Sequence, residues 1–239
     1  MLGSGGSDDL ARWIKKRVHN TEKCFAFFES ELGGYLRNQG RTREKNLKIS
    51  GVLKNISDLE TPNLNAALEN VALAFDAVEQ HRKIMIDRMD VRAKQNLHLY
   101  KIILAHKIII LKDELKLREN AVTKETKKQQ ALEKATIKSG IDKTKIVQSQ
   151  LELAGANQEV VHSNLALTEH VERFETQKML DIKSILEEIL YSEMVFHAKS
   201  LELYSEAKNI LQAANIEEDI EYMNERLKFT HEEDLIKKQ

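Results

Sequence analysis

Residues Asn63 to Ser139 read NLNAALENVALAFDAVEQHRKIMIDRMDVRAKQNLHLYKIILAHKIIILKDELKLRENAVTKETKKQQALEKATIKS, without a glycine or a proline. Residues that favour helices, such as Ala, Leu, Glu and Lys, are frequent throughout this stretch. A continuous helix of this length would extend for roughly 110 Å, at about 1.5 Å per residue. Since a compact monomer of 239 residues is not that wide, we predict an elongated molecule.

The composition of the whole chain favours long helices and excludes several other classes. It contains one proline and nine glycines, whereas strand-rich folds need turn residues about every 8–12 residues. The net charge is −1, so the chain as a whole is not a polycation that seeks nucleic acid. No apolar run reaches the roughly 18 residues of a transmembrane helix. The single cysteine, Cys24, excludes an intrachain disulfide and fits a cytoplasmic environment.

Two breaks divide the chain into three long helices. At the first, Thr61 suits the cap of a helix and Pro62 its first position. At the second, Gly140 can end one helix and Asp142 can cap the next. We predict helices over about residues 8–57, 63–139 and 142–213, with bends in the first near Gly33–Gly34 or Gly40. A short acidic helix follows at 216–229.

The domain organisation follows from these boundaries. Residues 1–9 form a flexible lead that contains the sequence GSGGS, residues 10–229 form one domain, and residues 230–239 form a mobile tail. Three long helices joined by tight reversals predict an all-α, antiparallel three-helix coiled-coil bundle.

An alternating 4-3 spacing of apolar residues runs along the second helix. Polar residues such as Arg92 and Asn96 interrupt it, which favours a bundle whose helices change neighbours. The members are Leu64, Leu68, Val71, Phe75, Val78, Met85, Met89, Leu99, Ile103, Ile110 and Leu117.

The segment Lys101–Leu111 (KIILAHKIIIL) is apolar on nearly every face, so we expect neighbours on several sides. One three-helix bundle has too little interior to cover it, and a two-fold dimer is the commonest solution. The candidate dimer-interface residues are Ile103, Ile108, Ile109 and Ile110.

Charge is unevenly distributed. Residues 12–54 carry 11 Lys or Arg against 4 Asp or Glu, residues 116–145 carry 9 against 4, and residues 186–239 carry 6 against 13. Such asymmetry marks surfaces that meet a charged partner, although each window alone also fits a solvated helix face.

The N-terminal segment has two interpretations. Leu10, Trp13, Ile14 and Val18 share one helix face, and Arg12, Lys15 and Lys16 lie away from it. This pattern is typical of an interfacial helix that inserts Trp13 and Ile14 between lipids. It is more often the pattern of a first helix that packs on its own bundle.

Six short blocks resemble the Chibby-interacting BAR-domain family, over roughly Arg17 to Tyr222. They are Asn20–Phe25 (NTEKCF), Arg41–Lys45 (RTREK), Glu60–Leu64 (ETPNL), Phe174–Lys183 (FETQKMLDIK), Glu193–Lys199 (EMVFHAK) and Glu202–Tyr204 (ELY). The resemblance implies a crescent-shaped BAR homodimer, binding to anionic lipids of the phosphoinositide or cardiolipin type, and membrane remodelling. It also implies a Chibby-like partner, with a location at the ciliary base or the mitochondrion. Members of the family have a proline near the position of Asn96, and this chain has none.

In such a dimer the reversal near Gly140 would form the distal end of each arm. A rigid curved rod presents Lys and Arg to anionic head groups, and each contributes about 1 kcal/mol near the surface. The candidate lipid contacts are Lys124, Lys127, Lys128, Lys134, Lys138, Lys143 and Lys145 near this reversal, with Arg12, Lys15 and Lys16 at the N-terminus. Solvated lysines kept for solubility are the alternative for each.

We therefore predict a cytoplasmic protein, peripheral on membranes, that senses or generates curvature as a homodimer. The alternative is a coiled-coil scaffold or cytoskeletal adaptor without lipid binding. No catalytic, metal-binding or cofactor motif is present in the sequence, and the basic windows lack the interleaved aromatics of nucleic-acid platforms.

Overall fold

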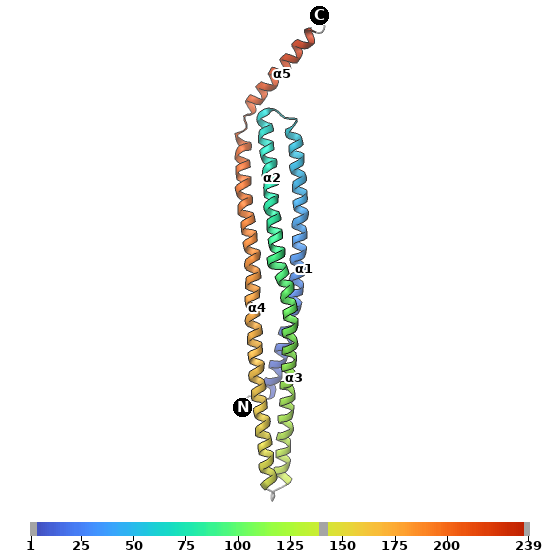
Figure 1. Cartoon of the computed structure of the whole chain (residues 1–239), viewed down its shortest axis with the longest axis vertical. Coiled ribbons are helices and arrows are strands. Elements are labelled where there is room, and N and C mark those ends of the chain that lie inside the picture. Colours follow the sequence, from blue (N-terminus) through green and yellow to red (C-terminus); the bar gives the residue numbers. More distant parts are fainter. Residues whose placement is uncertain (1–3, 139–142, 237–239) are drawn as a thin grey trace. The chain divides into compact units, whose positions relative to one another are not determined.

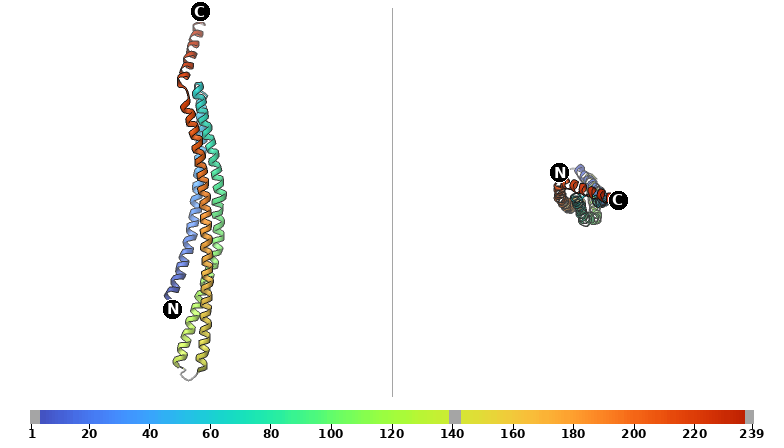
Figure 2. Two further views of the ribbon diagram at one scale, coloured as in Figure 1. Left: turned by 90° about the vertical axis from the view of Figure 1, so that its left-hand side faces the viewer. Right: turned by 90° about the horizontal axis from the view of Figure 1, so that it is seen from above.

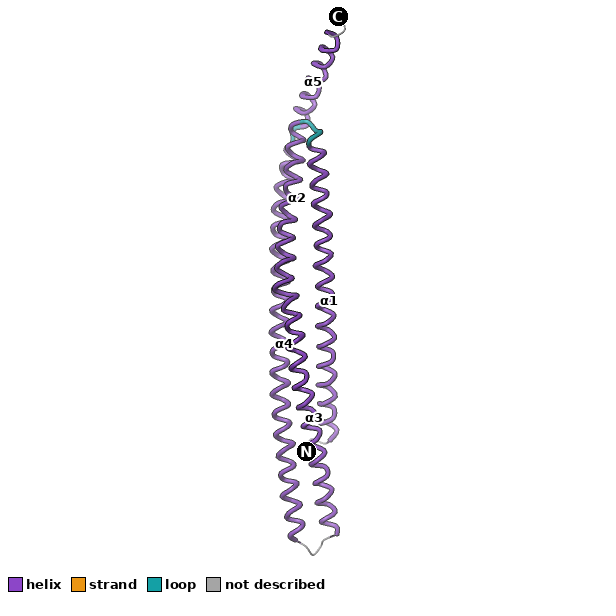
Figure 3. The backbone as a smooth tube through the Cα atoms, turned by 45° about the vertical axis from the view of Figure 1, so that its right-hand side comes forward, coloured by secondary structure: helices purple, strands orange, loops and turns teal. Residues whose placement is uncertain are grey.

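The computed structural model describes residues 4–138 and 143–236, and within these ranges the chain is helical apart from two short connections, with no strand (Figure 3). This confirms the all-α prediction. The elements are α1 (Ser4–Ser57), α2 (Pro62–Met89), the π-helical turn η1 (Asp90–Lys94), α3 (Gln95–Lys138), α4 (Lys143–Ala213) and α5 (Ile216–Ile236). The first predicted break lies between α1 and α2, with Pro62 at the first position of α2. The second, at residues 139–142, lies outside the described residues.

Two helix boundaries differ from the sequence expectation. Helix α1 begins at Ser4, inside the segment expected as a lead, and continues unbroken past its glycines. None of the described glycines has a positive φ, so each adopts helical backbone angles without strain. Helix α5 extends to Ile236 rather than ending near residue 229. The side-chain oxygen Oδ1 of Asn215 accepts the N–H groups of Glu217 and Glu218 at 3.1 and 3.3 Å, which caps the start of α5, and no Gly or Pro follows to end the helix.

The chain divides into two compact units that share its long helices. Unit 1 contains Met1–Glu29 and Leu97–Ser184, and unit 2 contains Ser30–Asn96 and Ile185–Gln239. In unit 1 the first part of α1 runs parallel to α4 and antiparallel to α3 (Figure 1). In unit 2 the later part of α1 runs parallel to α4 and antiparallel to α2 (Figure 2). Each unit is thus a three-helix antiparallel arrangement.

The π-helical turn η1 changes which face of the second predicted helix is buried. Before it, Val78, Met85 and Met89 are buried as the 4-3 spacing predicts. Beyond it, Leu99, Ile103, Ile110 and Leu117 are 38–58% exposed, so the single chain does not cover this row along α3. The buried residues are instead Ala93, Leu97, Tyr100, Leu104, Ile108, Leu111 and Leu115. A π turn holds one residue more than an α turn, and this shifts the buried face by one position.

The core of unit 1 consists of large apolar side chains from all three helices. The rings of Phe25 on α1 and Tyr100 on α3 lie 4.5 Å apart between centroids, and Phe174 of α4 is buried. Burial raises the pKa of the Tyr100 hydroxyl strongly, and the nearby carboxylates of Asp181 and Glu175 act in the same direction. The ring therefore stays neutral.

The core of unit 2 contains a fully buried carboxylate. Glu79 of α2 has no exposed surface and accepts hydrogen bonds from Asn46 Nδ2 at 2.7 Å and Arg82 Nε at 2.8 Å. Arg82 also donates to Gln39 Oε1, and its guanidinium lies 4.6 Å from the centroid of the Phe196 ring. This network joins α1, α2 and α4, because a buried charge must find polar partners on its neighbours.

Candidate lipid-contact and docking surfaces

The predicted lipid contacts near the α3–α4 reversal fall into two groups. Lys124 and Lys128 on α3 form ion pairs across to Glu159 and Glu152 on α4, each at 2.6 Å. The bond from Lys128 lowers the pKa of Glu152, so both partners remain charged at neutral pH. These two lysines hold the two helices together and are partly neutralised.

The other lysines near the reversal include three exposed ammonium groups. Lys127, Lys134 and Lys143 are exposed and have no ion pair among the described residues. Lys145 is exposed but has a partner. The side chain of Lys138 lies outside the described ones. The tip lysines, defined as Lys127, Lys134 and Lys143, are therefore the group that best fits a flat anionic surface.

Of the two residues predicted to insert into lipid, Trp13 and Ile14, only Ile14 packs into unit 1. Ile14 is 3% exposed and Trp13 is 50% exposed, so Ile14 belongs to the core and only Trp13 is accessible. Lys15 is paired with Glu119 on α3 at 2.8 Å, and Arg12 with Asp9 at 3.4 Å. Lys16 is exposed. Ile14 therefore packs on its own bundle. Any contact of this segment with a membrane would have to be made by Trp13 and Lys16.

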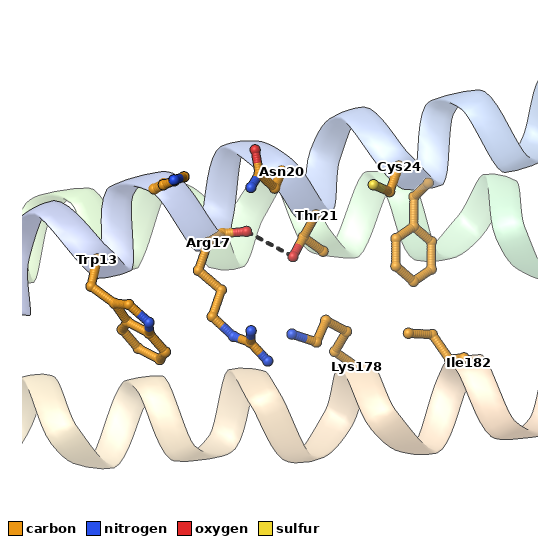
Figure 4. Close-up of a pocket in the computed structure, with 9 residues that line it drawn as sticks. Trp13, Arg17, Asn20, Thr21, Cys24, Lys178 and Ile182 are labelled. Carbon is orange, nitrogen blue, oxygen red and sulfur yellow. Dashed lines mark hydrogen bonds between the residues drawn. The ribbon is translucent and has the colours of Figure 1, made fainter.

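A groove of about 420 Å³ lies between α1 and α4 in unit 1. In Figure 4 the side chains of Trp13 and Arg17 extend from α1 toward α4, and Lys178 and Ile182 extend back from α4. The Arg17 guanidinium lies 5.4 Å from the Trp13 ring centroid, which is a cation–π distance. The remaining lining residues are Lys16, Asn20, Thr21, Cys24 and Phe25.

The charge of this groove is partly compensated from within. Arg17 donates to both carboxylate oxygens of Glu175 at 2.7 Å, and Lys178 Nζ also donates to Glu175. Burial opposes ionisation of Glu175, but the two cations lower its pKa below the ordinary value. One carboxylate thus fixes two cations of the groove wall, and Lys16 is the cation of the wall that has no ion pair among the described residues.

The candidate dimer-interface isoleucines separate into two sets. Ile108 is 2% exposed within the single chain, so its surface is already covered by unit 1. Ile103, Ile109 and Ile110 are 50, 57 and 38% exposed. Only these three are available to a second copy.

Unit 2 carries further exposed apolar rows that the sequence analysis did not single out. On α1, Ile49, Val52 and Ile56 are 46, 56 and 40% exposed at spacings of three and four residues, and we call them the α1 apolar seam. On α4, Leu190, Met194 and Leu201 are 61–70% exposed. The α4 row could have been found from its 4-3 spacing with His197. The sequence could not show that these two faces are exposed, because exposure depends on which helices lie against them.

A basic row on α1 was also missed as a unit, although it lies in the first basic window. Arg37, Arg41, Lys45 and Lys48 are exposed at spacings of four, four and three residues, which places them on one helix face. None of the four has an acidic partner among the described residues, and Arg41 bonds only to the Asn38 amide oxygen at 3.4 Å. We call these four residues the α1 basic row.

Two structural absences apply to the described part of the chain. None of its helices combines the length and the apolar character needed to span a bilayer. No group of three or more His, Cys, Asp or Glu side chains in it is arranged to hold a metal ion.

Solved structures with a similar fold are BAR domains. The N-terminal I-BAR domain of D. discoideum IBARa has a TM-score of 0.64 at 15% identity, covering 91% of this chain and 97% of that one. The Drosophila amphiphysin BAR domain has a TM-score of 0.56 at 14% identity, covering 91% and 99%. The long helices and the three-helix arrangement of each unit thus have the fold of a BAR domain.

Sequence comparison defines the family. The model for the FAM92 protein family matches residues 5–222. CBY1-interacting BAR domain-containing protein 1-B of Xenopus laevis is 31% identical over 220 residues, which cover 92% of this chain and 76% of that protein. The human CBY1-interacting BAR domain-containing protein 1 is 30% identical over 214 residues, covering 90% and 73%. The chain belongs to the FAM92 family, which confirms the resemblance drawn from its sequence blocks.

Proposed function

We propose that this protein is a homodimeric BAR-domain protein that binds anionic membranes and senses or generates their curvature, with residues 10–229 as the BAR domain. The observation that carries the proposal is the group of tip lysines, which are exposed and form no ion pair with any residue that the structure describes, near the facing ends of α3 and α4. Ammonium groups near an anionic bilayer contribute about 1 kcal/mol each, so several at fixed spacing give useful affinity. No catalytic role is proposed.

The proposed dimer is supported by the apolar rows of unit 2. Exposed apolar rows at coiled-coil spacing are typical of surfaces that a second helix covers. A two-fold dimer uses the same patch twice, and the α1 apolar seam is suited to this because Ile49 and Ile56 flank Val52 almost symmetrically. Exposed Ile103, Ile109 and Ile110 of unit 1 are a second candidate surface. A crescent shape is part of the proposal.

The lipid test is co-sedimentation with vesicles of neutral phosphatidylcholine, with or without phosphatidylserine, a phosphoinositide or cardiolipin. We expect binding that needs an anionic lipid and falls at high salt. The variant Lys127→Glu/Lys134→Glu/Lys143→Glu should lose at least about tenfold in affinity, since repulsion replaces three attractive contacts. A matched variant, Lys83→Glu/Lys112→Glu/Lys208→Glu, reverses three exposed lysines away from the tip and should bind nearly as well as the unmodified protein.

The same experiment decides between the proposal and the scaffold alternative. Binding that ignores lipid charge, or no binding at low salt, would favour a coiled-coil adaptor. The dimer is tested separately by sedimentation equilibrium of Val52→Asp, which should weaken association at least about tenfold because a charge is buried twice across the axis. The control Ile137→Asp changes a residue that is 84% exposed in unit 1 and should leave the dimer intact.

We further propose a Chibby-like protein partner and a location at the ciliary base or on mitochondria. The names of the Xenopus and human relatives state an interaction with CBY1. Co-precipitation with a Chibby-type protein, together with imaging of a tagged chain against centriolar and mitochondrial markers, tests both. A diffuse signal without either marker would refute the location.

A further inference from the structure

Helix α5 is fixed at its first turn and apolar along an uncovered face. Asp219 is 6% exposed, and its two carboxylate oxygens accept the N–H groups of Asn63 at 2.9 Å and Leu64 at 2.8 Å. Thr61, the N-cap residue of α2, makes no side-chain capping bond, so Asp219 performs that task from another helix. Burial opposes ionisation of Asp219, but these N–H groups lower its pKa, so it stays charged and holds α5 in place at neutral pH.

From this anchor α5 continues past the α1–α2 connection instead of folding back along unit 2 (Figures 1 and 2). One face of it, which we call the α5 apolar face, consists of Ile216, Ile220, Met223 and Leu227, which are 47–68% exposed. Beside it runs the α5 acidic row, Glu217, Glu221 and Glu225, all exposed and spaced by four residues. A helix with an apolar face and a charged flank gains stability when a partner covers that face.

The chain carries a surface of matching chemistry. The α1 basic row offers four unpaired cations, and the α1 apolar seam continues the same helix. Opposite charges at i, i+4 spacing on two helices are the arrangement that fixes partner and register in coiled coils. The row lies on the part of α1 that precedes the connection, whereas α5 continues beyond that connection, so α5 does not cover the row of its own chain (Figure 1).

A second copy brings the two surfaces together. Suppose that the two α1 helices of a dimer run antiparallel and that the two-fold axis passes at Val52. A residue that follows Val52 by n positions in one copy then lies level with the residue that precedes Val52 by n positions in the other copy. Ser57, the last residue of α1, is then level with residue 47 of the other copy. Helix α5 continues beyond Ser57, so it runs level with residues before 47, where Arg37, Arg41 and Lys45 lie. Its 21 residues extend for about 31 Å, and the basic row occupies roughly 16 Å.

We propose that α5 is an intermolecular strap: its apolar face and acidic row dock on the α1 basic row of a second copy of this chain. This inference rests on the proposed homodimer and adds a second contact outside the α1 apolar seam. One such contact at each end of the dimer would fix the register of the two antiparallel copies. Sliding one copy along the other would move the α5 acidic row away from the α1 basic row, and this would lose the attraction between them.

The test uses two charge-reversed chains. The first carries Glu217→Lys, Glu221→Lys and Glu225→Lys, and the second carries Arg37→Glu, Arg41→Glu and Lys45→Glu. Each homodimer should dissociate at least about tenfold more readily at low salt, since like charges then face each other. Mixing the two chains should restore a heterodimer about as tight as the unmodified dimer, because both of its α5–α1 contacts again join opposite charges. The control Lys112→Glu/Lys116→Glu/Lys134→Glu reverses three exposed lysines of unit 1 and should dimerise normally.

Sedimentation equilibrium measures dissociation, and circular dichroism confirms that each variant stays helical. Reversed chains that dimerise as tightly as the unmodified protein would overturn the strap and leave the homodimer standing. If both homodimers are weakened but mixing the two chains does not restore a tight heterodimer, the α5 acidic row and the α1 basic row do not contact each other between copies. That result would also overturn the strap. An unmodified chain that remains monomeric at all concentrations would overturn the strap together with the proposed dimer.

Discussion

The guanidinium of Arg17 binds both carboxylate oxygens of Glu175, with Nε–Oε1 and Nη2–Oε2 distances of 2.7 Å each. The two residues are 158 positions apart in the sequence, so the pair fastens the start of α1 to α4 within unit 1. Arg17 is about half exposed and Glu175 is mostly covered. Such a two-point contact is the geometry in which a partly exposed ion pair contributes measurably.

Replacing Arg17 should therefore destabilise the protein slightly. We expect Arg17→Ala to lower the free energy of unfolding by about 1 kcal/mol, because solvent screens the exposed half of the pair. The midpoint of urea unfolding measures this. Arg12→Ala serves as the control, since the Arg12–Asp9 pair is more than 70% exposed on both sides and should contribute almost nothing. Equal effects of the two substitutions would contradict the expectation.

The pair also predicts a pH dependence. The pKa of Glu175 lies below its ordinary value of 4.5 in the folded chain. Its contribution to stability is therefore fully present above about pH 4.5 and is lost as the pH falls through the lower, folded pKa. The stability difference between the unmodified protein and Glu175→Gln should be constant near neutral pH and shrink under acid conditions. Urea unfolding at a series of pH values tests this, and a difference that persists unchanged in acid would refute it.

The buried carboxylate of Glu79 should be far more sensitive than any surface charge. Glu79→Ala leaves Arg82, whose side chain is 12% exposed, without its counter-charge, and we expect a loss of about 3–5 kcal/mol. The double variant Glu79→Leu/Arg82→Leu should recover much of this loss, because it removes both charges and keeps the volume. Asp76→Ala breaks the more exposed Lys54–Asp76 pair and should cost less than about 1 kcal/mol. Chemical unfolding of all three variants gives the comparison.

Deletion of Val91 tests the role of η1. Val91 is 52% exposed, so its own side chain contributes little to packing. Its removal would turn the π turn into an α turn while α3 keeps its present rotation, because the residue removed is the one that the π turn holds in excess. The face with Leu104, Ile108 and Leu111 would then stay in the core, and we expect the free energy of unfolding to change by less than about 1 kcal/mol.

Deletion of Ile102 provides the matched contrast. Its side chain is 58% exposed, but no π turn follows it in α3, so the face with Leu104, Ile108 and Leu111 would rotate out of the core at a cost of more than about 4 kcal/mol. Thermal unfolding followed by circular dichroism should show a small change for the Val91 deletion and a large drop for the Ile102 deletion. Similar melting temperatures would mean that α3 tolerates either register.

The sequence alone was sufficient to locate the helices. Pro62 marks the start of α2, Ala213 was expected as the end of α4, and Ile216 as the start of α5, and all three agree with the structure. Helix propensity, capping and chain breaks act over a few residues, so they can be recognised without knowledge of the neighbours. The sequence blocks also identified the family, and the family model matches residues 5–222, a range that contains all six blocks.

Which side chains are covered depended on the packing of distant segments. A regular 4-3 spacing placed Ile103 and Ile110 in one row with the buried Met85 and Met89, but one extra residue in η1 turned Leu104 and Ile108 inward instead. Lys124 and Lys128 could not be separated from Lys127 by pattern, because their partners Glu159 and Glu152 come from the opposing helix. The role of Asp219 as a cap for α2 also required a contact over 156 positions. Local sequence specifies a helix, whereas the burial and pairing of each side chain depend on which other helix lies against it.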